Sequence, residues 1–421
     1  MKRIVLLSLF AVMILLSIPS LKMGGARFGQ LAILGSFFLF FWEDLMRKDV
    51  AWRILLFFWI AAVLMILLSL NSTSVKIGES KFFVKYLLIF PAAFYTGFYY
   101  IRYIDLRTLI RALEIIVLIL CLNALLIDLG VVPEAIKNII VSYRTAFEGS
   151  AKYIEYQGTF AEAGWFAITV ETTAIFALLL RYDFSIWPQK HRWILALLYG
   201  FVFVSLVLSK NKTVWIGLLA IMLFLILYKG MLTLIRTNRY MPEYIRMRDP
   251  LLARFSRLNT NRMLLMIVVL ILAFFIANTL LPKPIITAEM LAEKMQHERG
   301  KAFMIVMDLL GRTHWIGGYG FGFVEAYFTL FPQGVIGLGP GSGMIFNSYL
   351  DIWLSVTILG LIFHLLLLWF SSSSRYYVTM AIPILLFVYA NFNPSIGDEY
   401  YYLFLGMSYG IVTCYKDRGH G

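Results

Sequence analysis

The sequence predicts an all-α, polytopic membrane protein, and three observations lead to this fold class. Of the 421 residues, 61% are hydrophobic and only 14% are charged, and the mean hydropathy is +0.80. A soluble chain of this length could not cover its core with so little polar surface. Apolar runs of about 18 residues or more recur and are unbroken, which is typical of membrane-spanning helices rather than of the alternating strands of a membrane barrel.

Twelve segments are predicted to span the membrane, each about 20 residues long, and they form a single membrane domain over residues 1–421. The first span follows Met1-Lys2-Arg3 and imitates a secretory signal. No small-residue cleavage site precedes a soluble domain, so we expect this segment to remain as a span. In chain order the predicted spans cover residues 4–20, 28–43, 52–70, 82–101, 109–131, 163–181, 192–208, 213–229, 263–281, 346–370, 376–392 and 399–415.

The distribution of lysine and arginine predicts which side of the membrane each loop faces. Loops of one parity hold most of the basic residues, and by the positive-inside rule these loops are cytoplasmic. Both termini are then cytoplasmic, and the two long connections 132–161 and 282–345 face outward. The basic loop 229–262 is expected to lie at anionic lipid headgroups, so the net charge of +13 does not indicate nucleic-acid binding. Cys121 and Cys414 fall in or beside spans, so no disulfide framework is expected.

The outer connection 282–345 is far longer than a typical loop. It is predicted to contain a helix over residues 288–310, with Gly311 as the C-terminal cap. Arg299 lies on the apolar stripe of this helix. It either extends to lipid phosphates or points into an outward cavity, where its guanidinium binds an anion in a bidentate manner. The stripe consists of Phe303, Val306, Met307 and Leu310.

The segment after this helix combines charged, aromatic and glycine residues. No strand or βαβ unit precedes it, so it is not a dinucleotide-binding motif; such a loop instead favours close backbone approach to a bulky ligand. Its aromatic side chains either stack on sugar rings or anchor the loop at the membrane interface. Its histidine is either a base or a hydrogen-bonded loop residue. The residues concerned are Arg312, His314, Trp315, Tyr319, Tyr327 and the run Gly317–Gly322.

The other long outer connection, 132–161, runs directly into the sixth span. Glu162 stands at the outer end of that span, where the helix dipole favours an ionised carboxylate. It is either a proton acceptor or a simple N-terminal cap. Arg144 belongs to the same connection. Glu171 lies about two turns deeper, and an intramembrane carboxylate is functional by default, but it falls on a different face of the helix from Glu162.

Two shorter outward turns also carry charge. Lys210 and Lys212 occupy the turn between the seventh and eighth spans, against the positive-inside trend, and we expect them to meet an anion there. Asp398 and Glu399 are adjacent carboxylates in the turn before the last span. This pair is either a second acid or a means of keeping the loop soluble.

The sequence lacks the motifs of metal and nucleotide enzymes. It contains no HExxH, no cysteine and histidine spacing of a zinc site and no Walker sequence, and its outer loops contain no Asp-x-Asp pair. Metal-dependent sugar-nucleotide chemistry and ATP hydrolysis therefore lack their parts, and no metal or cofactor is expected.

Four segments resemble the O-antigen polymerase and O-antigen ligase superfamily, the Wzy-type and WaaL-type membrane glycosyltransferases. Ser209–Thr213 is similar to the Ser-x-Ser-Arg-like segment of the family, with Lys212 in place of arginine and Asn211 in place of serine. Gly158–Glu162 resembles the Gly-x-Phe-x-Glu-Pro-Ser stretch of exopolysaccharide polymerases, although alanine and glycine replace proline and serine.

The remaining two segments lie in and after the major outer loop. Arg299–Gly322 resembles the arginine-started helix that leads to a Gly-x-Gly turn. The segment that begins at Phe346-Asn347, with Gly360 downstream, resembles the His-Asn-x-x-Leu helix start. Phe346 stands where that histidine is usual, and this difference favours a polymerase over a ligase.

The resemblance implies a GT-C-like helical protein of the bacterial inner membrane. In this family a sugar hydroxyl attacks the anomeric carbon of an undecaprenyl-diphosphate-linked glycan at the outer leaflet, and undecaprenyl diphosphate leaves. Membrane lipid surrounds the site, and a chain-length regulator and a flippase are the implied partners. The alternatives are an O-antigen ligase that transfers glycan to lipid A core, a transporter of lipid-linked oligosaccharides or polyols, and a non-catalytic assembly partner.

The resemblance also implies roles for individual residues. Glu162 is the first candidate for the catalytic base and His314 the second. Fixed cations are needed for the leaving diphosphate, and the candidates are Arg299, Lys210 and Lys212. Further candidates for substrate binding are Arg144, Arg312, Trp315, Tyr319, Asn347 and Glu399.

Overall fold

The computed structural model of the chain is helical almost throughout. Strands β1 (Lys22–Met23) and β2 (Ala26–Arg27) form a short antiparallel pair between the first two helices. The structure describes residues 2–23, 26–141, 158–160, 163–188, 192–237, 299–330, 347–373, 376–392 and 395–415.

The helices of the N-terminal part begin and end close to the predicted spans, because long apolar runs define them. The third predicted span, 52–70, coincides with helix α3. A π-helical turn, η1, joins two helices within the fourth span. The elements are α1 (Lys2–Leu16), α2 (Phe28–Met46), α3 (Trp52–Leu70), α4 (Glu79–Val84), η1 (Lys85–Ile89), α5 (Phe90–Tyr103), α6 (Leu106–Asp128) and α7 (Glu134–Ile140).

The C-terminal part repeats this agreement, except in the tenth predicted span, where two helices replace one. The ninth predicted span, 263–281, lies outside the described residues. The elements are α8 (Ala163–Asp183), α9 (Arg192–Leu208), α10 (Lys212–Thr237), α15 (Arg299–Arg312), α16 (Phe323–Leu330), α17 (Ser348–Val356), α18 (Ile358–Phe370), α19 (Tyr377–Phe392), η3 (Ser395–Gly397) and α20 (Glu399–Cys414).

Within the described ranges, five helices are long and apolar enough to cross a membrane. Shorter apolar helices accompany them in the regions of α9, α10, α18 and α19. The chain is therefore an all-α protein with the helices of a membrane-embedded domain. The five long segments are Phe28–Met46, Trp52–Leu70, Glu79–Tyr103, Leu106–Asp128 and Gly164–Asp183.

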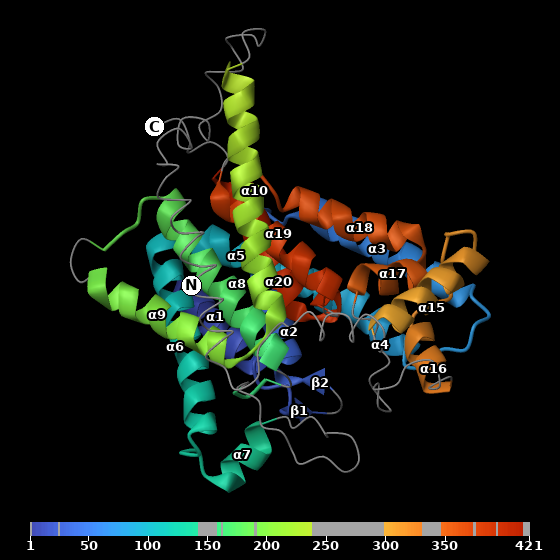
Figure 1. Cartoon of the computed structure of the whole chain (residues 1–421), viewed down its shortest axis with the longest axis horizontal. Helices are drawn as coiled ribbons and strands as arrows, with labels where there is room; N and C mark the ends of the chain where they lie inside the picture. Colours follow the sequence, from blue (N-terminus) through green and yellow to red (C-terminus); the bar gives the residue numbers. More distant parts are fainter. Residues whose placement is uncertain are drawn as a thin grey trace.

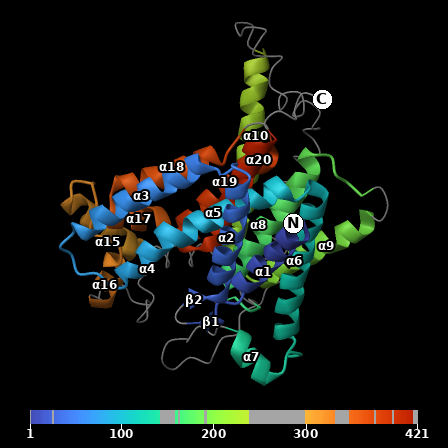
Figure 2. The same cartoon turned by 180° about the vertical axis from the view of Figure 1, so that it is seen from behind.

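The helices form two groups that cross at a steep angle (Figures 1 and 2). Helices α3 and α18 lie side by side, and with α5 they run obliquely to α6, α8 and α10. Helices α15 and α16 lie at one end of the molecule, and α9 lies at the other. This arrangement separates the two parts of the chain in which sequence analysis places site residues.

The closest helix packing joins α5 and α20. A Cβ atom on Gly97 would lie 2.1 Å from the Leu403 carbonyl oxygen, and one on Gly406 would lie 2.0 Å from the Phe94 carbonyl oxygen. Small residues of this kind let two membrane helices approach backbone to backbone. Phe90 stacks on Tyr402 with ring centroids 4.0 Å apart, so aromatic side chains complete the same contact.

The tenth predicted span is broken at Thr357, which has a φ of 80°. The break leaves carbonyl groups at the end of α17 without partners in their own helix. The glycine run supplies those partners: Gly318 N–H donates to Leu354 O at 2.9 Å, and Gly320 N–H donates to Ser355 O at 2.7 Å. A side chain on Gly317 would lie 2.0 Å from the Trp353 carbonyl oxygen. The close backbone approach of the glycine run is therefore to the protein itself.

Helix α15 also differs in detail from its prediction. It continues to Arg312, so Gly311 lies within the helix instead of capping it. Val306 and Leu310 are buried as predicted and pack with Phe323 and Leu354, whereas Phe303 is 48% exposed. Residues 288–298 of the predicted helix lie outside the described residues.

Candidate functional site

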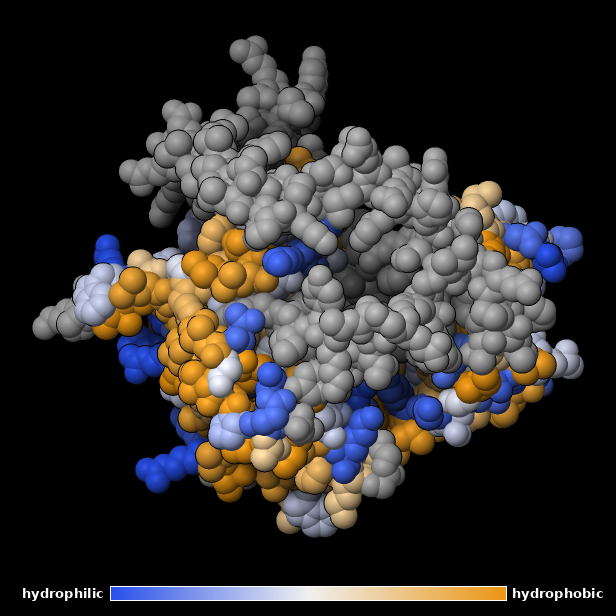
Figure 3. All heavy atoms as spheres, turned by 60° about the horizontal axis from the view of Figure 1, so that its bottom comes forward, coloured by the Kyte–Doolittle hydropathy of each residue, from blue (hydrophilic) through white to orange (hydrophobic). Residues whose placement is uncertain are grey.

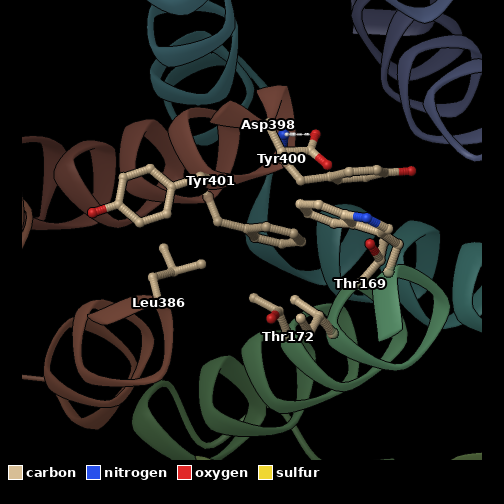
Figure 4. Close-up of a pocket in the computed structure, with 9 residues that line it drawn as sticks. Thr169, Thr172, Leu386, Asp398, Tyr400 and Tyr401 are labelled. Atoms are coloured by element: carbon tan, nitrogen blue, oxygen red, sulfur yellow. Dashed lines mark hydrogen bonds between the residues drawn. The ribbon is translucent and has the colours of Figure 1, made fainter. Parts of the chain in front are cut away.

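A recess lies between the N-terminal part of α8, helix α19 and the start of α20, and we call it the α8–α20 recess. Figure 4 shows it with Asp398 and Tyr400 above and with Thr169 and Thr172 of α8 below. The recess is narrow: about 280 Å³ of space lies between its side chains, the open space at its mouth included, but only about 10 Å³ of this space is open to the centre of a water molecule. Its lining residues are Trp165, Ile168, Thr169, Thr172, Leu386, Asp398, Tyr400, Tyr401 and Phe404.

The recess has a carboxyl pair at its edge. Asp398 caps α20, and its Oδ1 accepts a hydrogen bond from Tyr400 N–H at 3.2 Å. Glu399 is 1% exposed, and its Oε1 accepts a hydrogen bond from Gln30 Nε2 at 2.5 Å. Because Asp398 is partly buried and lies next to a second carboxylate, its pKa is raised to about 7. A carboxyl group with such a pKa is suited to accept or donate a proton near neutral pH.

Two basic residues accompany this pair. Lys85 Nζ donates to the Gly397 carbonyl oxygen at 2.7 Å, which fixes the turn immediately before Asp398. Lys85 and Arg27 both lie close enough for their positive charges to attract the Glu399 carboxylate. Arg27 is exposed, so it adds positive charge at the surface beside the carboxyl pair.

The lysine turn meets the beginning of α8. Asn211 lies between the two lysines, and its Oδ1 accepts a hydrogen bond from Thr213 N–H at 2.8 Å. A side chain on Gly164 would lie 2.9 Å from Asn211 Nδ2, so the turn packs against the first turn of α8. Lys210 is exposed and has a φ of 54°, and Lys212 is the first residue of α10. The turn therefore adjoins the residue before Trp165, which lines the recess.

Phe160 connects the chain before α8 to the recess. Its buried ring lies 5.9 Å from that of Phe166 and 6.4 Å from that of Tyr400, measured between centroids. Glu162, the first candidate for the base, lies outside the described residues, as does Arg144.

Asn347 is tied to the turn that precedes Asp398. Its Oδ1 accepts a hydrogen bond from Leu350 N–H and caps α17, and its Nδ2 donates to Asn391 Oδ1, both at 3.0 Å. The neighbouring Ser348 Oγ accepts a hydrogen bond from Ile396 N–H at 3.4 Å. Asn347 therefore attaches the start of α17 to the end of α19, and Ser348 attaches it to the turn before Asp398.

The remaining predicted site residues belong to the region of α15 and α17. Arg312 forms an exposed ion pair with Asp308 at 2.6 Å. The hydroxyl group of Tyr319 donates to Leu309 O at 3.0 Å. Trp315 accepts a hydrogen bond at its carbonyl oxygen from Trp353 Nε1 at 2.8 Å. His314 is exposed and has a φ of 50°.

The structure thus divides the predicted site residues into two sets. Lys210, Lys212, Asn347 and Glu399 lie around the elements of the α8–α20 recess. His314 belongs to the set carried by α15 and the turn after it, at the end of the molecule remote from α9 (Figure 1). The side chain of Arg299, the first residue of α15, lies outside the described part of the chain.

Sequence analysis did not identify the threonines and tyrosines of the recess. They come from α8 and α20, which are far apart in the chain, and no motif connects them. The signal that was available was the adjacent pair Asp398 and Glu399.

Figure 3 shows that hydrophilic side chains gather on the face that carries β1, β2 and α7, between hydrophobic flanks.

No group of three or more His, Cys, Asp or Glu side chains suited to a metal ion occurs in the described ranges. In comparisons with known proteins, the chain matches no protein-family model and no curated sequence.

Proposed function

We propose that this chain is a glycosyltransferase that polymerises undecaprenyl-diphosphate-linked polysaccharide repeat units at the outer leaflet of the bacterial inner membrane. The observation that carries the proposal is the α8–α20 recess. It places a carboxyl group with a pKa of about 7, Asp398, beside the aromatic ring of Trp165. The lysine turn packs against the same end of α8. The resemblance of the lysine turn and of the Glu162 segment to this superfamily supports the same assignment.

The proposal includes a topology of twelve spans with both termini in the cytoplasm. The start of α8, the lysine turn and the turn before α20 then face outward together, as the Lys/Arg distribution predicts. Single cysteines at Lys152 and Gln296 should react with a membrane-impermeant thiol reagent in intact spheroplasts, and one at Arg246 should not. Labelling at position 246 alone would refute this orientation.

The proposed reaction transfers a glycan between lipid carriers. An acceptor hydroxyl oxygen attacks the anomeric carbon of the donor, the bond from that carbon to the diphosphate oxygen breaks, and the diphosphate leaves with the electron pair. Asp398 accepts the proton of the hydroxyl group, and Glu162 is the alternative base expected from sequence. Lys210 and Lys212 stabilise the charge that develops on the diphosphate, and Arg299 is the third candidate cation.

Trp165, which lines the recess, suits a sugar ligand. Its side chain is partly exposed, and the apolar face of a sugar ring can pack on such a ring. Fixed lysine and arginine charges would serve in place of a metal ion. A chain-length regulator and a flippase are the proposed protein partners, since a polymerase needs a supply of repeat units at the outer leaflet and a limit on their number.

The test is the glycolipid profile of a strain from which this gene is deleted. Accumulation of lipid-linked single repeats supports a polymerase. Accumulation of long lipid-linked polymer would show an O-antigen ligase, which performs the same transfer to a different acceptor. Repeat units that stay on the cytoplasmic leaflet would show a transporter.

Complementation with variants connects the profile to the recess. Asp398→Asn keeps an oxygen for the helix cap but cannot accept a proton, so polymer synthesis should fall by about a hundredfold or more. The matched control is Asp308→Asn, because Asp308 is an exposed aspartate whose partner is Arg312 on the same helix. Normal polymer from the Asp398 variant, with loss of polymer from Glu162→Gln, would move the base to Glu162. Loss from His314→Ala instead would move it to the α15 turn.

A further inference from the structure

Helix α8 holds a carboxyl group in the interior of the membrane domain. Glu171 is 1% exposed and Tyr389 is fully buried. The Tyr389 hydroxyl group donates a hydrogen bond to Glu171 Oε2, whereas Glu171 Oε1 is buried and has no hydrogen-bond partner among the described residues. Within the described part of the chain, one oxygen of the carboxyl group therefore accepts a hydrogen bond and the other has no donor.

No basic side chain of the described residues forms an ion pair with Glu171. The titratable group that faces it is Tyr389 of α19, and α10 contributes Gly217 and Ile221 to the surrounding packing. A buried carboxylate with neither a counter-ion nor a full set of donors is strongly disfavoured, and such a group takes up a proton instead.

A second buried glutamate, Glu114 of α6, shows the contrast. Glu114 accepts two hydrogen bonds from Arg181, from Nε and Nη2, each at 2.6 Å. It also accepts one from the Tyr199 hydroxyl group at 3.2 Å. Glu114 therefore has a guanidinium counter-ion and three hydrogen-bond donors, whereas Glu171 has one hydroxyl donor and no basic partner among the described residues.

Glu171 lies next to the α8–α20 recess. Thr172 follows it in the chain and lines the recess (Figure 4). Among the described residues, Thr172 Oγ1 and Thr169 Oγ1 are buried and form no hydrogen bond. Both threonines line the recess, and a hydroxyl group is able both to donate and to accept a proton. Hydroxyl groups with unused hydrogen-bonding capacity therefore lie on the same helix as the Glu171 carboxyl group, beside the recess.

We propose that Glu171 is a proton-binding site inside the membrane domain, and that it exchanges its proton with water in the α8–α20 recess through the hydroxyl groups of Thr172 and Tyr389. The ligand of this site is the proton itself. The inference does not depend on the glycosyltransferase assignment, because it follows from the burial and contacts of the carboxyl group.

Infrared spectroscopy of the wild-type protein and of Glu171→Gln in lipid tests the proposal directly. The difference spectrum should contain the C=O stretch of a protonated carboxyl group, and this band should shift when the protein is transferred into D₂O. A difference spectrum with carboxylate bands would overturn the proposal, and a protonated band that does not shift in D₂O would overturn the exchange. Thr172→Val should slow the shift while leaving the band in place.

A chemical test needs no variant and so does not depend on how Glu171→Gln folds. Dicyclohexylcarbodiimide is an apolar reagent to which protonated carboxyl groups in membranes add: the carboxyl proton goes to a carbodiimide nitrogen and the carboxyl oxygen bonds to the central carbon. Peptide mass spectrometry locates the product. Glu171 should be labelled at least about tenfold faster than Glu114, because both oxygens of Glu114 are bound by the Arg181 guanidinium group. Equal labelling of the two residues, or labelling of Glu114 alone, would refute the proposal.

Discussion

The ion pair between Glu114 of α6 and Arg181 of α8 gives the sharpest prediction about stability. Both residues are nearly buried, at 8% and 7% exposure. Besides its two bonds to Glu114, Arg181 donates from Nη1 to the Ile186 carbonyl oxygen at 2.7 Å. Tyr199 of α9 donates to the same carboxylate, so the pair connects three helices. The two charged groups therefore have most of the hydrogen-bond partners that they can accommodate. Removal of either side chain leaves the other charge buried and unpaired.

The size of the effect follows from this burial. Glu114→Gln should lower the free energy of unfolding by about 3–5 kcal/mol, because the guanidinium group is left without its counter-ion. Arg181→Lys keeps the charge but not the two-pronged geometry, so the loss should be smaller, at about 1.5–3 kcal/mol for the hydrogen bonds to a charged group. The double variant Glu114→Leu/Arg181→Met removes both charges and should be close to neutral.

The assay is thermal and denaturant unfolding of the purified protein in one detergent, and the single variants Glu114→Leu and Arg181→Met complete a double-mutant cycle with the double variant. The expected pattern is strongly non-additive, with the double variant more stable than either of these single variants. A double variant as unstable as the sum of the two single changes would refute the reasoning, because the side chains would then stabilise the fold by packing and not as a pair. Tyr199→Phe removes one hydrogen bond and serves as a mild control.

Three further predictions concern the recess and the glycine run. Activity should rise as the pH increases through about 7, where Asp398 ionises, and Asp398→Asn should abolish this rise in a pH–rate profile. Because folding raises the pKa of this group, the unfolded chain loses the proton first, so the free energy of unfolding should fall as the pH rises from about 4 to about 7. Gly317→Ala should lower the melting temperature, since its Cβ would lie 2.0 Å from the Trp353 carbonyl oxygen, whereas Gly311→Ala has open space around it and should be neutral or stabilising by up to about 1 kcal/mol. Lys212→Ala should reduce polymer synthesis about a hundredfold while Lys212→Arg restores much of it, and equal polymer from both variants would exclude a role for its charge.

The sequence was sufficient to place most helices, because apolar runs of spanning length are a local property. It was not sufficient to place the break at Thr357. The residues around the break, Leu354 and Ser355, carry no proline or glycine signal, and the hydrogen bonds that stabilise it come from Gly318 and Gly320 in a distant loop. A helix break that depends on such long-range partners cannot be read from its own segment.

The candidate site shows the same division between local and long-range information. From the sequence, Lys210, Lys212 and Glu399 are predicted to be charges at outward turns, because each stands at the end of an apolar run. It could not show that Asp398 meets α8, nor that His314 belongs to a different part of the molecule. Which helix ends meet depends on packing such as the close approach of Gly97 to α20, and one chain without its structure does not reveal such pairings.

Helix α8 carries residues of three features: the Glu114–Arg181 ion pair, the proposed proton site at Glu171 and the α8–α20 recess. Trp165 lies at one end and Arg181 at the other, about 24 Å apart at the rise of an α-helix, with Glu171 between them. A change at Arg181 should therefore lower the melting temperature without moving the pH at which activity is half-maximal, because it weakens the attachment of the helix and not the ionisation of Asp398. A change at Asp398 should move or abolish the pH dependence of activity and have a smaller effect on the melting temperature. If variants at Arg181 shifted the pH profile by as much as variants at Asp398, the profile would report the packing of α8, and the assignment of proton transfer to the recess would fail.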